Sequence, residues 1–140
     1  MKHLAELEAK LLPLFREAAE RIGQEHPSFK FQVFSSSVGG ATAYQGHNLG
    51  LECMFPDAGD HEADCVAASV RVMHLTTEPM LSEVGVEWGS GQHPDVRVEF
   101  VEHAAPLTQG SLDEVATRLP ELFAVFRAPL QAWGSRNASA

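Results

Sequence analysis

The chain has 140 residues, 44% of them hydrophobic and 21% charged, and a formal net charge of −9 at pH 7. This size and composition indicate one soluble globular domain, and no apolar run approaches the roughly 20 residues that a membrane-spanning helix needs. The excess of acidic side chains repels a phosphate backbone, so we expect neither nucleic acid nor a membrane as a partner.

The first 22 residues have the spacing of an amphipathic helix. Apolar side chains recur every three or four positions from Leu4 to Ile22, with charged residues between them. Pro13 lacks a backbone N–H and its ring clashes with the preceding turn, so we expect it either to kink this helix or to divide it. Acidic residues interrupt this segment and no cleavage site follows it, so we expect no signal peptide and a cytoplasmic protein.

Five stretches with apolar residues at every second position follow this helix. Such alternation predicts antiparallel strands with one face packed and the other in contact with water, and the short connections favour a meander. The five stretches are residues 29–33, 49–55, 66–72, 84–88 and 96–100.

The last part of the chain is again helical in its pattern. Ser111 and Glu114 have the spacing of a capping box, and an apolar stripe follows over residues 112–133. Pro120 and Pro129 interrupt the stripe, which disfavours one long straight helix. A short helix that ends before Pro120, followed by a second helix that begins with it, is an equal alternative.

Together these elements predict an α+β fold. We expect a two-layer sandwich of helix, five-stranded antiparallel meander and helix, with both helices on one face of the sheet. Five strands about 4.8 Å apart give a sheet about 24 Å wide, and two helices, each about 10 Å across, cover most of one face. Residues 1–134 form this single domain in our prediction, and the small polar residues 135–140 form a frayed tail.

Two His-Pro pairs, at residues 26–27 and 93–94, each precede an alternating stretch and raise the question of a duplication or a shared metal site. The first pair follows a helix and the second follows a glycine turn, so the flanking elements do not repeat. In a meander the first and fifth strands lie at opposite edges, about 19 Å apart, so His26 and His93 cannot share a metal ion.

Motifs for catalysis or metal binding are weak. Within the segment DHEADC, residues 60–65, His61, Asp64 and Cys65 lie close in sequence but lack the helical turn that places zincin ligands on one face. Ser90 is not part of a nucleophile elbow, and the chain has no phosphate-binding loop. We therefore expect no catalytic residue, no metal site and no cofactor.

Two candidate binding surfaces remain. One is the open face of the sheet, where charges alternate in sign between strands and surround an apolar strip, although an ordinary solvated face has the same pattern. Its candidate residues are Phe34, Met54, Arg71, Met73, Arg97 and Val101. The other is a pocket at one end of the sheet, where adjacent antiparallel strands bring Tyr44, His47 and His74 close, although histidines at hairpin ends are commonly only surface residues.

These surfaces favour a binding protein over an enzyme. We expect a small acidic protein-interaction module, chaperone-like or immunity-like, that binds a protein partner or a second copy of itself through the open sheet face. The alternative is a small-molecule-binding protein or an enzyme that uses the histidine-containing pocket.

Overall fold

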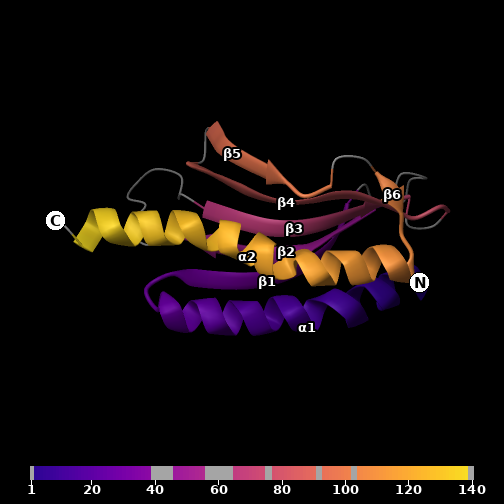
Figure 1. Cartoon of the computed structure of the whole chain (residues 1–140), viewed down its shortest axis with the longest axis horizontal. Helices are drawn as coiled ribbons and strands as arrows, with labels where there is room; N and C mark the ends of the chain where they lie inside the picture. Colours follow the sequence, from indigo (N-terminus) through magenta and orange to yellow (C-terminus); the bar gives the residue numbers. More distant parts are fainter. Residues whose placement is uncertain are drawn as a thin grey trace.

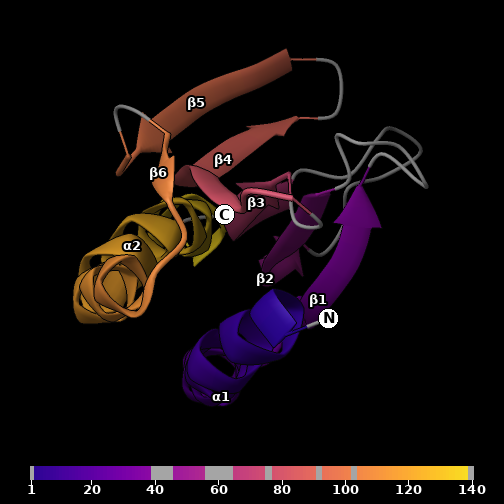
Figure 2. The same cartoon turned by 90° about the vertical axis from the view of Figure 1, so that its right-hand side faces the viewer.

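The chain folds into two layers, an antiparallel sheet and a pair of long helices, with both helices on one face of the sheet (Figures 1 and 2). The predicted α+β sandwich is thereby confirmed. None of the helices in the described ranges is long and apolar enough to cross a bilayer. The computed structural model describes residues 2–38, 46–55, 65–74, 77–90, 93–101 and 104–138.

Each helix is continuous. Helix α1 spans Lys2–Glu25 and contains Pro13, and helix α2 spans Gln109–Ala138 and contains Pro120 and Pro129. Division of either helix at a proline, which the sequence left open, is therefore wrong. Pro13 and Pro120 are exposed, so water can bond to the carbonyl group that each proline leaves without an N–H donor.

Helix α2 begins earlier and ends later than its sequence pattern indicates. Thr108 caps it: the Ser111 backbone N–H donates to Thr108 Oγ1 at 3.0 Å, and the Thr108 N–H donates to Ser111 Oγ at 2.8 Å. This reciprocal pair is a capping box that begins one turn before the predicted one. Residues 135–138 continue the helical backbone, while the domain boundary at 134 and the fraying of 135–140 stay predictions.

Five strands form the predicted meander in chain order, and all neighbours are antiparallel. They are β1 (Lys30–Val38), β2 (Gly46–Met54), β3 (Cys65–Met73), β4 (Met80–Ser90) and β5 (His93–Glu99). A two-residue strand, β6 (Ala105–Pro106), pairs with the start of β4. Strands β1 and β5, each preceded or begun by a His-Pro pair, therefore lie at opposite edges.

The face of the sheet beneath the helices forms the hydrophobic core. The two helices run side by side in the same direction across this face (Figure 1), and Phe15 of α1 meets Phe123 of α2 edge to face with ring centroids 5.3 Å apart. Alternate residues of the central strands β2 and β3 are fully buried against the helices: Leu49, Leu51, Cys53, Val66, Ala68, Val70 and Val72.

A β-bulge interrupts the alternation at one end of β4. Arg71 pairs with Glu83, but the next residue, Val72, pairs with Leu81, so Ser82 is the additional residue. The Ser82 hydroxyl donates to the Arg71 carbonyl oxygen at 3.1 Å. The bulge brings Leu81 into the core, where it is 3% exposed.

Candidate functional site

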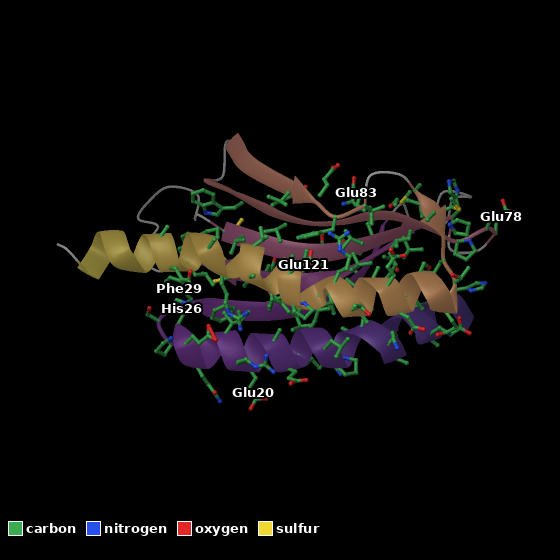
Figure 3. All side chains as sticks on the ribbon, in the orientation of Figure 1. Glu20, His26, Phe29, Glu78, Glu83 and Glu121 are labelled. Carbon is green, nitrogen blue, oxygen red and sulfur yellow. The ribbon has the colours of Figure 1, made fainter. Side chains whose placement is uncertain are left out.

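The first His-Pro pair belongs to the turn between α1 and β1. The His26 ring stacks on Phe29 with centroids 5.4 Å apart, and Phe29 stacks on Phe55 at 5.2 Å. Figure 3 shows His26 and Phe29 together at this end of α1. The Phe29 N–H also donates to the His26 carbonyl oxygen at 3.1 Å. His26 thus packs as an aromatic ring that closes the core at the start of β1.

The predicted apolar strip on the open face is divided among three places. Met54 pairs with Lys30 at one end of the β1–β2 ladder. Phe34 lies four residues further along β1, opposite Gly50, and Met73 lies at the far end of β3. Met54 is 50% exposed and is the one large exposed hydrophobic residue among those described. The apolar contacts offered by this face are therefore separate points surrounded by polar residues.

The two remaining candidates at the edge of this face differ in position. Arg97 pairs in register with Glu87 of β4. Val101 lies beyond the end of β5 and packs partly against the hydrophobic core. Val101 therefore borders the open face but does not belong to one of its strands.

Arg71 lies on the open face in a half-exposed ion pair. Its Nη1 atom is 3.6 Å from Glu83 Oε2, and the two side chains are 40% and 41% exposed. Its Nε atom is buried and has no hydrogen-bond partner within the described residues, and the same holds for Oδ1 of its register neighbour Asn48. This part of the open face is thus partly shielded from water.

A small depression lies in the middle of the open face. Ser69 of β3 and Gly85 of β4 lie opposite each other there, and the depression above them has a volume of about 10 Å³. That volume holds about one water molecule. Three glutamates on β4 and β5 surround it: Glu83, Glu87 and Glu99.

His47 lies at the start of β2 within a polar cluster beneath the sheet. The His47 residue is 4% exposed, and its Nε2 atom lies 2.5 Å from Ser35 Oγ of β1. The Ser35 hydroxyl donates to Glu8 Oε2 of α1 at 2.9 Å. The Glu8–Ser35–His47 cluster therefore connects α1, β1 and β2 through side chains that are 27 and 12 positions apart in sequence.

The hydrogen bonds place a proton on one ring nitrogen of His47. Because Ser35 donates its proton to Glu8, Ser35 Oγ accepts from an N–H on His47 Nε2. Burial lowers the pKa of His47, against the smaller opposing effect of the nearby Glu8 carboxylate. The other ring nitrogen, Nδ1, is buried without a partner in the described structure. A second proton would therefore have no acceptor.

The cluster contains serine, histidine and glutamate but not the geometry of a catalytic triad. In a triad the histidine accepts the serine proton, and a carboxylate bonds to its second ring nitrogen. Here Ser35 lies between the other two groups and donates to Glu8, while Nδ1 of His47 contacts no carboxylate in the described chain. This arrangement connects three elements of the fold and differs from a triad in the order of its groups.

His74 lies at the same end of the sheet as His47, because His47 pairs in register with Val72. It follows β3 in the left-handed region, with φ of 56°, and its carbonyl oxygen accepts from the Thr77 N–H at 3.1 Å. His74 therefore starts the turn to β4. Tyr44 lies outside the described residues, so a pocket formed by Tyr44, His47 and His74 stays a prediction.

A larger hollow lies between β4, the segment after β5 and the first half of α2, and its volume is about 220 Å³. Arg118 borders it, donates from Nη1 to the Phe100 carbonyl oxygen at 2.7 Å and lies 4.9 Å above the centre of the Phe100 ring. The walls are otherwise mostly apolar: Leu81, Val84, Val101, Ala105 and Val115. Sequence reasoning missed this hollow because it depends on where Phe100, Val101 and Ala105 lie, and these residues carry no motif.

Metal ligands do not gather in the part of the chain that the structure describes, where no group of three or more His, Cys, Asp or Glu side chains could hold an ion. Residues 60–64 of the DHEADC segment lie outside the described ranges, and Cys65, which begins β3, is exposed. No family model, no curated protein and no solved structure matches this chain. Its function is therefore inferred from its own surfaces.

Proposed function

We propose that this chain is a small acidic protein-interaction module that binds a protein partner across the open face of its sheet. One observation carries the proposal: both helices lie on the same face, so no described element covers the opposite face of the five strands (Figure 2). An uncovered sheet face with separate apolar points among charged residues has the mixed character of a transient protein interface.

The size of the open face supports a protein as the partner. The shortest of the five main strands, β5, has seven residues, which at about 3.3 Å per residue span about 23 Å, and five strands span about 24 Å. The resulting area of about 550 Å² is most of the roughly 800 Å² that one partner contributes to a standard interface. The depression that the described residues form in the middle of this face, about 10 Å³, is too small for a metabolite.

Charge favours a basic partner. The chain carries a net charge of −9, and the rows of the open face contain four glutamates, Glu52, Glu83, Glu87 and Glu99, and three basic residues, Lys30, Arg71 and Arg97. A basic surface is attracted over long range, and the alternating charges then determine its orientation. Met54, half exposed beside Lys30, offers an apolar contact at one end.

Two matched variants test the location of this surface. Glu52→Lys with Glu87→Lys changes the open face, whereas Glu17→Lys with Glu20→Lys makes the same change in net charge on α1, where Glu20 points away from the sheet (Figure 3). Each variant and the wild type are used as bait in a native lysate, after circular dichroism has shown that all three are folded. We expect a stoichiometric partner with the wild type and the α1 variant, and its loss with the open-face variant.

Other outcomes would contradict the proposal in different ways. Equal loss of the partner in both variants would mean that only net charge matters, and a partner retained by both would place its site elsewhere. If the wild type captures no protein under these conditions, binding across the open face is rejected.

The 220 Å³ hollow beside Arg118 favours a second candidate function, the binding of a small apolar ligand. A bound ligand stabilises the folded state in proportion to its concentration relative to Kd. Thermal unfolding in a panel of small apolar acids and amides tests this candidate, with Val115→Ala as a variant that enlarges the hollow and changes the ligand response. A panel without any shift in melting temperature would reject it.

A further inference from the structure

The two edges of the sheet differ in how they meet solvent. Strand β5 has seven residues and begins with His93 and Pro94, and its register with β4 shifts between Trp88 and Gly89. Charged residues occupy every second position along it: Asp95, Arg97 and Glu99. A proline without an N–H, a bulge and regular charges are the features by which natural sheet edges avoid pairing with another strand.

Strand β1 has none of these features except one charge. Its nine residues pair with β2 in an unbroken register from Lys30 to Val38, without proline or glycine, and Lys30 is its single charged residue. On its outer side, no strand in the described ranges pairs with it. A long, regular edge strand of this kind presents backbone N–H and C=O groups to a further strand.

The polar cluster holds this edge in place. Ser35 lies in the middle of β1, and its hydroxyl bonds to Glu8 of α1 and to His47 of β2. Phe31, near the start of β1, packs partly against the core. An edge strand fixed along its length loses little conformational freedom when another strand pairs with it, which favours association.

We propose that β1 pairs antiparallel with β1 of a second copy of this chain, around a twofold axis at Phe34. In this register Phe34 faces its own counterpart, while residues 31, 32 and 33 face the three small residues Ser37, Ser36 and Ser35 of the second copy. Each large side chain thus meets a serine, and Lys30 faces Val38, so no like charges are opposed. This internal complementarity between the two halves of β1 favours a second copy over an unrelated strand.

The same pairing explains why association stops at a dimer. A twofold interface uses the same edge of both copies. The combined sheet then ends on both sides in β5, the edge that carries the proline, the bulge and the regular charges. Residues directly opposite each other in an antiparallel pair lie on the same face, so the two open faces become one continuous surface.

Salt separates this association from the binding of a basic partner. Each copy has a net charge of −9, so two copies repel each other at low ionic strength, and screening favours the dimer. Binding of a basic partner to the open face weakens with salt for the same reason. The proposed dimer does not depend on the proposed function. Rejection of either proposal therefore does not reject the other.

Charged substitutions close to the twofold axis test the dimer. Sedimentation velocity measures its dissociation at several protein concentrations and at two salt concentrations. Gln32 and Ser36 are both exposed, and Gln32 of one copy faces Ser36 of the other in the proposed register. The double variant Gln32→Lys, Ser36→Lys opposes like charges at two symmetric positions, and we expect at least about tenfold weaker dimerisation. The double variant Gln32→Glu, Ser36→Lys opposes unlike charges at the same positions and should restore the dimer.

The rescue makes the test independent of folding, because both double variants change the same two exposed residues. The Gln32→Lys, Ser36→Lys variant also reduces the magnitude of the negative net charge of each copy. This reduction by itself favours association, so a weaker dimer cannot result from general repulsion between the copies. A wild-type chain that remains monomeric at all concentrations and at high salt overturns the proposal. A dimer that neither variant affects overturns the β1 interface.

A disulfide reports the register directly. In a Cys65→Ser background, Phe34→Cys places a thiol on the axis, opposite its counterpart, and we expect a covalent dimer on mild oxidation. Lys30→Cys places the thiol four residues from the axis, so the two sulfur atoms are about 26 Å apart and should not cross-link. Equal cross-linking by both variants would contradict this register.

Discussion

The two faces of the sheet share one alternating pattern but are constrained in different ways. Beneath the helices, alternate residues of β2 and β3 are fully buried, and their size and shape are determined by packing against α1 and α2. On the open face, residue size varies more widely. Gly50 has no side chain, and the ring of Phe34 lies over it. Steric limits there are local, as at Gly50.

The largest difference between the faces is expected for adjacent residues of β2. Leu51 is fully buried, and Leu51→Ala should lower the free energy of unfolding by about 2–5 kcal/mol, because it removes buried methyl groups and leaves a cavity. Its neighbour Glu52 points to the open face, and Glu52→Ala should change stability by no more than about 0.5 kcal/mol. Urea unfolding of both variants measures the contrast, and equal losses would mean that the open face is covered.

Gly50 tests the local steric limit on the open face. A Cβ atom at this position would lie 2.9 Å from Cζ of Phe34 and would overlap the Ala68 carbonyl oxygen. Because backbone must move, Gly50→Ala should cost about 1–3 kcal/mol of unfolding free energy. The control is Gly110→Ala in the first turn of α2, where the nearest atom, Thr108 Oγ1, is 3.6 Å away. No loss is expected there, and a loss like that of Gly50→Ala would contradict the steric explanation.

His47 makes the buried face sensitive to pH. Its pKa is lowered in the folded state by burial, so the unfolded chain binds more protons once pH falls below the ordinary histidine pKa of 6.5. Stability is therefore lost between pH 6.5 and the lower folded pKa, and it returns as pH rises. His47→Gln keeps an N–H that can donate to Ser35 but cannot titrate.

Chemical unfolding of the wild type and His47→Gln between pH 7.5 and 5.5 measures this contribution. Both proteins contain the other six histidines, so the difference between their slopes isolates His47. We expect the variant to lose less stability in this interval than the wild type. Parallel slopes would show that His47 gains its proton as easily in the folded state as in the unfolded chain.

The smallest expected effect is that of the ion pair on the open face. Arg71 and Glu83 are both half exposed and 3.6 Å apart, so their coupling should be about 0.2–1 kcal/mol and should shrink in high salt. A double-mutant cycle with Arg71→Gln and Glu83→Gln measures it. A coupling well above this range would mean that the shielded Nε atom of Arg71 makes this part of the face resemble the interior.

The alternation of apolar and polar residues was sufficient to predict the layers, the strand order and the buried face. Prediction from this pattern failed where contacts between distant segments determine the structure. Three serines, Ser35 to Ser37, resemble a turn in sequence, but pairing with residues 47–49 of β2 extends β1 through them. The bulge at Ser82 depends equally on pairing between strands.

The continuity of the helices and the Glu8–Ser35–His47 cluster could not be predicted from the sequence, for related reasons. Local propensity places a helix end at Pro120, whereas burial of Leu119, Leu122 and Phe123 around it keeps the helix intact. Glu8, Ser35 and His47 have no common motif, and only the packing of α1 under β1 and β2 brings them together. The apolar strip on the open face required a strand register that the sequence does not specify.

The two cysteines lie on neighbouring strands but on opposite faces. Cys53 is buried, and burial raises the pKa of its thiol to about 12, whereas Cys65 is exposed at the start of β3. A thiol-reactive dye should therefore label Cys65 in the native protein and reach Cys53 only when the sheet opens. Cys65 thus offers a natural attachment point for a fluorescent dye, and the rate at which Cys53 is labelled reports how often the sheet opens.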